Sequence, residues 1–200
     1  AIMCAVMFAV WRFNRNIPGL QAWTLSYLFG FGVGALLLLR DSGAENLHNA
    51  LPVVTTFVCI FATAYASLVG ARAYVGRPPL PIGYAWAGAL LMGASAFHFT
   101  AIQPHVGVRV LLASTVAGVL YLCSARVFMH AGLASFPARR LVAWAYAVHG
   151  AFLLLRPWLF KLGTTLDGTP DLATQLSHFI ILESTIALIL LAFGTLMLVN

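Results

Sequence analysis

The sequence predicts an all-α, polytopic bundle of transmembrane helices, and three observations support that fold class. The composition is 62% hydrophobic and only 8% charged over 200 residues, with a mean hydropathy of +0.93, far from the usage of soluble domains. Apolar stretches long enough to cross a bilayer follow one another with short turns between them. Arginines recur in these turns, as is typical of the ends of membrane helices.

Seven segments result when the chain is divided into stretches of about 20 apolar residues, the length that crosses a hydrocarbon core of roughly 30 Å. Six complete spans are expected at Leu20–Leu39, Ala50–Gly70, Ile82–Ala101, Val106–Met129, Leu141–Phe160 and Leu176–Val199. The first segment, Ala1–Trp11, covers only about 16 Å, so we expect it to be the end of a truncated span. Residues 1–200 are thus expected to form a single membrane domain.

Basic residues are divided unequally between the two sides, and this inequality predicts the orientation. One side carries seven arginines: Arg12, Arg15, Arg72, Arg77, Arg126, Arg139 and Arg140. The other side carries four basic residues and four of the five acids: Arg40, Arg109, Arg156, Lys161, Asp41, Glu45, Asp167 and Asp171. The richer side is expected to be cytoplasmic, which places the N-terminus outside and the C-terminus in the cytoplasm.

The charged residues and the cysteines exclude several classes of protein. The formal net charge is +6, but the basic residues stand at helix ends rather than on one face, which favours lipid headgroups over nucleic acid. The three cysteines, Cys4, Cys59 and Cys123, fall at different depths and have no disulfide or metal-binding spacing. No nucleophile, base and orienting group converge by spacing, so we expect no catalytic residue in this chain.

Three ionisable residues inside the predicted spans form the first candidate site, because such groups are costly in hydrocarbon. Glu183 is expected roughly 10 Å inside the last span. Arg156 lies nearer the same outer surface, and His149 precedes it by seven residues on the same helical face. We therefore expect His149 and Arg156 to face Glu183. The group is either a buried ion pair that fixes packing or a ligand-contacting or proton-sensing site in the outer half of the bundle.

Further candidate ligands come from His98, His178 and Arg109. His98 and His178 are each expected about a turn inside the outer end of a span, where imidazoles are suited to haem iron or a transition metal. Histidines that only face headgroups explain the same positions. Arg109 follows Gln103-Pro104-His105 at the outer entry to the span Val106–Met129. There it either pairs with an anionic ligand or lipid phosphate or extends to the headgroups.

Glycine and tryptophan positions are explained by packing and by the membrane interface. Gly30-x-x-x-Gly34 predicts a close contact between helices, and it is no nucleotide-binding loop because no strand precedes it. All five tryptophans lie near predicted span ends, where aromatic belts form: Trp11, Trp23, Trp86, Trp144 and Trp158.

Several motifs stand in a definite order along the chain: Trp23, Leu36-Leu37-Leu38-Leu39-Arg40, Asn49, Gly70-x-Arg72-x-Tyr74-x-Gly76-Arg77, Gln103-Pro104 with Arg109 and Ser114, and the closing run from Gly194 to Asn200. In order and spacing they resemble the membrane-embedded sensor regions that precede the GGDEF catalytic domain of many bacterial diguanylate cyclases. The resemblance extends over most of the chain, and it rests on the pattern because no single motif is diagnostic.

The resemblance implies a seven-helix sensory or anchoring domain in the bacterial inner membrane, acting as a homodimer. Its last helix would pass into a cytoplasmic coiled coil and a cyclase that makes cyclic di-GMP from two GTP molecules. That catalytic domain is expected beyond residue 200, since no Gly-Gly-Asp-Glu-Phe sequence occurs here. The input would be an unknown small molecule in the outer half of the bundle. A haem-binding membrane cytochrome or redox sensor, and a small transporter with an internal repeat, stay open as alternatives.

Overall fold

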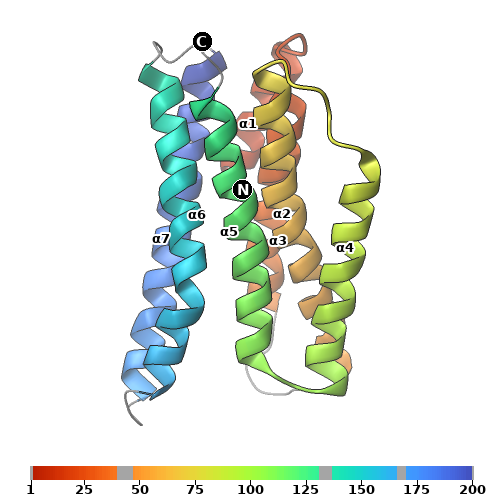
Figure 1. Ribbon diagram of the computed structural model, residues 1–200, viewed down its shortest axis with the longest axis vertical. Helices are drawn as coiled ribbons and strands as arrows, with labels where there is room; N and C mark the ends of the chain where they lie inside the picture. Colours follow the sequence, from red (N-terminus) through yellow and green to blue (C-terminus); the bar gives the residue numbers. More distant parts are fainter. Residues whose placement is uncertain (1, 40–46, 131–136, 166–169, 200) are drawn as a thin grey trace. The chain divides into compact units, whose positions relative to one another are not determined.

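The computed structural model describes residues 2–39, 47–130, 137–165 and 170–199. For residues 38–39, 47–49, 160, 162–165, 170–178 and 180–181 it describes the backbone alone. Within these ranges the chain folds into seven α-helices and one short π-helix (Figure 1), which confirms the all-α prediction. They are α1 (Ile2–Phe13), α2 (Leu20–Leu39), α3 (Leu47–Tyr74), α4 (Ile82–Phe97), η1 (His98–Ile102), α5 (Val106–Met129), α6 (Pro137–Thr165) and α7 (Pro170–Val199).

In the described ranges, five helices are long and apolar enough to cross a membrane, so the chain is a multi-pass membrane protein by its helix composition. The apolar stretches are Leu20–Leu37, Ala50–Tyr74, Ile82–Ile102, Val106–Met129 and Leu182–Val199. Helix α1 is shorter than a span. Helix α6 is less apolar because His149, Arg156 and Lys161 lie along its middle and C-terminal part. The membrane prediction is confirmed, whereas the two further spans expected at α1 and α6 and the orientation stay predictions.

Four of the charged residues that predicted the orientation lie outside the described residues: Arg40, Asp41, Glu45 and Asp167.

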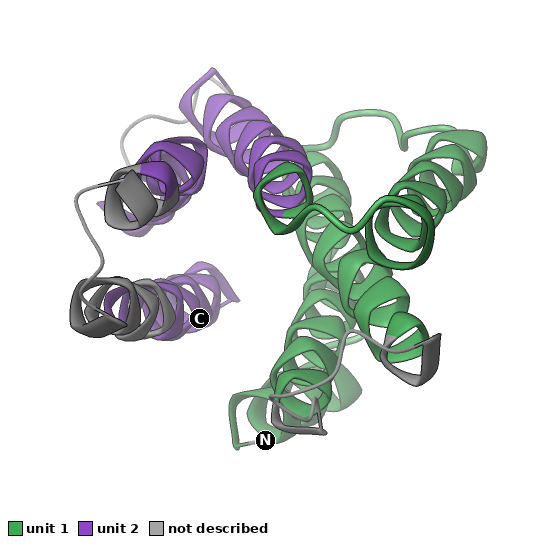
Figure 2. Ribbon diagram, turned by 90° about the horizontal axis from the view of Figure 1, so that it is seen from below, with its two compact units in different colours: residues 1–109 green, residues 110–200 purple. Residues whose placement is uncertain are grey.

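The chain divides into two compact units, residues 1–109 and 110–200, with the division inside α5 (Figure 2). Unit 1 contains α1 to α4 and η1. Unit 2 contains most of α5 together with α6 and α7. Each unit has its own buried side chains.

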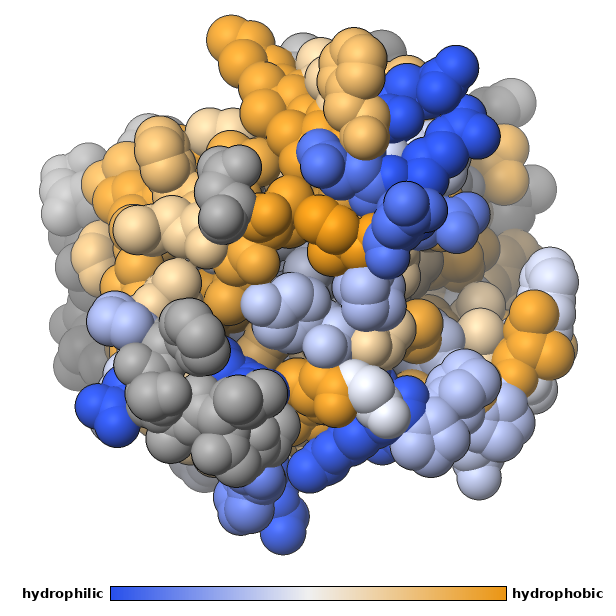
Figure 3. All heavy atoms as spheres, turned by 90° about the horizontal axis from the view of Figure 1, so that it is seen from above, coloured by the Kyte–Doolittle hydropathy of each residue, from blue (hydrophilic) through white to orange (hydrophobic). Residues whose placement is uncertain are grey.

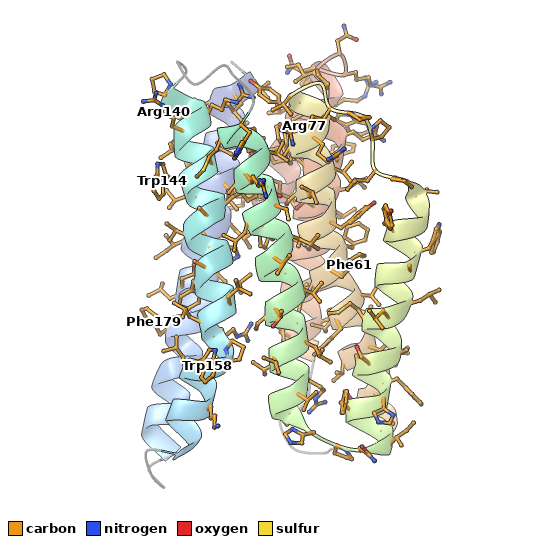
Figure 4. The ribbon with its side chains drawn as sticks, in the orientation of Figure 1. Phe61, Arg77, Arg140, Trp144, Trp158 and Phe179 are labelled. Atoms are coloured by element: carbon orange, nitrogen blue, oxygen red, sulfur yellow. The ribbon has the colours of Figure 1, made fainter. Side chains whose placement is uncertain are left out.

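In unit 1, α2 and α3 are joined by hydrogen-bonded hydroxyl groups. The Ser26 hydroxyl donates to the carbonyl oxygen of Thr63 at 2.9 Å and lies 2.8 Å from the Ser67 hydroxyl oxygen. All three residues are buried. Since a buried hydroxyl requires a partner, these bonds fix the register of the two helices. Phe61 of α3 packs directly over Gly88 of α4, because glycine has no side chain to occupy that space (Figure 4).

Trp23 belongs to the core of unit 1, and its interpretation as an interfacial belt residue is wrong. Its side chain is 1% exposed, and its ring centroid lies 5.5 Å from that of Tyr74. The indole fills the space over Gly70, where a Cβ atom would stand 2.5 Å from Trp23 Nε1. By contrast, Trp144 and Trp158 project outward from α6, as belt residues do (Figure 4).

The predicted glycine contact of α2 is right in its first residue and wrong in its second. An added Cβ at Gly30 would lie 3.7 Å from Thr63 of α3, but Gly34 has no neighbour within 4 Å. Gly32 takes its place, facing the sulfur of Cys59 at 3.7 Å. The rotation of α2 about its own axis, which spacing alone does not fix, decides which glycines meet α3.

Large apolar side chains lie on the outside of the helices. Trp86, Leu90 and Leu91 on α4 are each about two-thirds exposed. Such a surface would be unfavourable in water and fits the hydrocarbon of a bilayer. Figure 3 looks along the helices onto one end, where strongly hydrophilic residues (blue) interrupt the hydrophobic ones (orange).

Candidate functional site in the α6–α7 helix pair

The site in unit 2 begins with a close crossing of two backbones. A Cβ atom added to Gly118 of α5 would lie 2.9 Å from the carbonyl oxygen of Gly150 of α6, and the reverse distance is also 2.9 Å. Only residues without side chains allow two helices to approach in this way. Beside the crossing, Tyr121 of α5, three residues after Gly118, contacts His149 of α6, which directly precedes Gly150.

A stack of aromatic rings packs against the imidazole of His149 through Tyr121. The ring of Tyr121 meets it edge-on, with the centroids 4.9 Å apart and an interplanar angle of 62°. Tyr121 stacks on Tyr146 at 5.8 Å, and Tyr146 stacks on Phe128 at 6.0 Å. His149 is buried on α6, and the rings limit the positions that its imidazole can take.

His149 and Glu183 form the predicted pair. His149 Nδ1 lies 3.0 Å from Glu183 Oε1, with the two side chains 6% and 18% exposed. With a neutral imidazole, Nδ1–H donates to the carboxylate, and with a protonated one the contact becomes an ion pair. The Ser184 hydroxyl donates to the other carboxylate oxygen at a longer 3.4 Å. The pair connects α6 directly to α7.

Helices α6 and α7 run antiparallel, as three contacts along them show: Phe152 with Phe179, His149 with Glu183, and Val142 with Gly194. Side chains lean toward the N-terminus of their own helix. Arg156 therefore leans back toward the level of His149, while Glu183 leans toward the level of Arg156. The carboxylate of Glu183 and the guanidinium of Arg156 interact electrostatically, so the third predicted member also belongs to the site.

The charges of the three groups can balance one another. A charged Arg156, a charged Glu183 and a neutral His149 sum to zero, which an apolar environment favours. A proton on His149, or a negative charge delivered to Arg156, changes that balance and with it the attraction between α6 and α7.

Arg109 belongs to unit 1, whereas His149, Arg156 and Glu183 belong to unit 2. It is 5% exposed, and its Nη1 donates to the hydroxyl of Thr100 at 2.9 Å. Thr100 belongs to η1, the π-helical turn that ends α4, and its hydroxyl also donates to the carbonyl of Ala96 at 2.6 Å. Arg109 thus links α5 to η1 through a buried hydrogen bond, and its guanidinium does not extend freely to headgroups.

The proposed metal or haem pair is not tested by the structure. His98 begins η1 in unit 1, where its ring meets Phe99 edge-on at 4.9 Å. His178 lies on α7, but its side chain is outside the described residues. The described side chains contain no group of three or more histidine, cysteine or acidic residues that could hold a metal ion.

Sequence reasoning found the three ionisable residues but missed the groups that hold them. Tyr121 and the crossing of Gly118 with Gly150 were not predicted. The spacing Ser114-x-x-x-Gly118 on α5 is a signal that could have indicated this crossing, since small residues four apart commonly mark helix contacts. No family model, no curated protein and no solved structure matches this chain.

Proposed function

We propose that this chain is the membrane-embedded sensory or anchoring domain of a bacterial diguanylate cyclase, and that α7 couples it to a cytoplasmic output. The observation that carries the sensory part is the His149–Glu183 pair, which joins α7 to α6 inside an apolar helix bundle. Ionisable groups in this setting are costly and commonly functional. The resemblance to diguanylate cyclase sensor regions supplies the identity of the output.

In this proposal the domain lies in the bacterial inner membrane with its N-terminus outside and its C-terminus in the cytoplasm. It acts as a homodimer, because a diguanylate cyclase needs two catalytic domains facing each other. A stimulus that changes the charge balance of His149, Arg156 and Glu183 changes how α7 packs on α6. The rotation or spacing of the two α7 helices then changes, and the output follows.

The experiment measures cyclic di-GMP formed from GTP by membranes that contain the full-length protein. We expect formation by the wild type, and a several-fold change of rate, in the same direction, for His149→Gln and Glu183→Gln, since either substitution breaks the pair. Ile186→Val is the matched control, because Ile186 lies exposed on α7 three residues from Glu183. Its rate should equal that of the wild type.

Two results would count against the proposal separately. Membranes with the wild-type protein that form no cyclic di-GMP would refute the cyclase output. Equal rates for the wild type and both pair variants, at equal amounts of protein in the membrane, would refute the sensory role of the pair and leave only an anchoring role.

A further inference from the structure

Arg156 has a hydrogen-bond donor, its Nε–H, that the described part of the chain does not use. Its Nε is buried and has no partner among the described residues. A guanidinium carries five N–H donors and keeps its charge at all physiological pH values. Glu183 attracts it through space, but the direct bond of that carboxylate across the helices goes to His149.

A partly exposed apolar surface lies beside Arg156 on the helix pair. Phe152 lies one turn earlier on the same face of α6, and its ring meets that of Phe179 edge-on at 5.9 Å. Phe179 and Leu182 on α7 are both more than half exposed. Figure 4 shows Phe179 and Trp158 on the same half of the two helices. In a membrane, this exposed surface faces lipid tails.

From these observations we infer that Arg156 binds the anionic head of an amphiphile, a carboxylate or phosphate on a hydrocarbon tail, with the tail against Phe152 and Phe179. The planar guanidinium matches two oxygens of either head at once. Its own helix face supplies an aromatic contact for the first carbons of the tail. The head would stand roughly 6 Å inside the predicted end of the span, four residues from Phe160.

Glu183 gives the site a second property. Its negative charge lies close enough to act on Arg156, so it competes with an incoming anion for the same guanidinium. Neutralising Glu183 should therefore strengthen binding, whereas removing the charge of Arg156 should abolish it. An arginine that merely extends to the headgroups would show no dependence on Glu183.

As the identity of the stimulus, this inference rests on the proposed sensory function, but binding itself can be measured without any output. The full-length protein is placed in nanodiscs of phosphatidylcholine, and the binding of oleate or of added phosphatidylglycerol is measured by native mass spectrometry. The variants are Arg156→Gln, Arg156→Lys and Glu183→Gln. Arg140→Gln is the control, because Arg140 is an exposed arginine at the other end of α6 (Figure 4).

We expect saturable binding to the wild type, a loss of about tenfold or more with Arg156→Gln, a smaller loss with Arg156→Lys, and tighter binding with Glu183→Gln. A folding defect cannot produce changes of opposite sign. Binding of oleate without enrichment of phosphatidylglycerol would identify a free fatty acid as the ligand, and the reverse would identify a bilayer lipid.

Three results would overturn the inference. Equal losses in Arg156→Gln and Arg140→Gln would mean a general attraction of anions to helix-end arginines. Weaker binding by Glu183→Gln would mean that the carboxylate does not compete for Arg156. Displacement of oleate by equimolar acetate would mean that the tail contributes nothing. A bound amphiphile without cyclic di-GMP formation would leave this inference standing and refute only the cyclase output.

Discussion

Gly118 of α5 and Gly150 of α6 approach so closely that a methyl group on either would stand 2.9 Å from the carbonyl oxygen of the other. This crossing decides the geometry of the site, since His149 directly precedes Gly150 and Tyr121 lies about one turn after Gly118. The ionisable pair is therefore positioned by two residues that carry no chemistry. A substitution at either glycine should therefore displace the side chain of His149.

Gly150→Ala is expected to push α5 and α6 apart and to destabilise the protein by about 1–3 kcal/mol, the usual cost of overpacking. The measurement is thermal unfolding of the detergent-solubilised protein. Gly34→Ala is the matched control, because Gly34 also lies in a helix but has no neighbour within 4 Å, and alanine there favours the helix by up to about 1 kcal/mol. Equal stabilities of the two variants would contradict the close crossing.

The contribution of the His149–Glu183 contact can be isolated by a double-mutant cycle with His149→Gln and Glu183→Gln. We expect a coupling energy of about 1–3 kcal/mol, because a charged hydrogen bond with little exposure loses less to water than a surface pair does. The free energies come from equilibrium unfolding in mixed micelles. Ser184→Ala serves as the comparison, since its 3.4 Å contact with the same carboxylate should couple only weakly. A cycle that closes to zero would show that the two side chains do not interact.

The sequence predicted those features of the fold that depend on local chemistry. The bounds of α2 at Leu20 and α5 at Val106 and Met129 are as expected, because turns with Pro18-Gly19 and Gln103-Pro104 interrupt the apolar pattern there. Gly19 adopts a φ of 87°, which is a conformation that glycine permits. The pairing of His149 with Glu183 was predictable for a different reason, since an ionisable group in an apolar span requires a partner.

What the sequence did not predict depends on the rotation of each helix about its axis. Hydrophobicity around α2 is nearly uniform. The sequence pattern therefore did not indicate that Trp23 would face Gly70 or that Gly34 would face away from α3. The same holds for Tyr121, which contacts His149 only because α5 and α6 cross at two glycines. In a helix that is apolar on every side, packing is decided by shape and not by polarity.

Thr100→Val tests the π-helical turn of unit 1. The substitution removes the hydroxyl that accepts from Arg109 and donates to Ala96, while it keeps the volume of the side chain. Since Arg109 is buried, we expect a loss of about 1.5–3 kcal/mol, the range for hydrogen bonds to charged groups. Thermal unfolding gives the measurement. Thr55→Val removes an exposed intrahelical bond to Leu51 and should change stability by less than about 0.5 kcal/mol.

Gly70→Ala tests the packing of Trp23 in the core of unit 1. The new methyl group would stand 2.5 Å from Trp23 Nε1, and the rigid indole is 1% exposed and packs against Tyr74. We expect a loss of about 2–3 kcal/mol in the single variant. Trp23→Phe, a smaller ring, should restore part of that loss in the Gly70→Ala background although it destabilises the wild type. Trp144→Phe, at an exposed position of α6, should restore nothing. Because the two substitutions meet at one contact, their effects must be non-additive, and strictly additive stabilities would mean that Trp23 does not lie over Gly70.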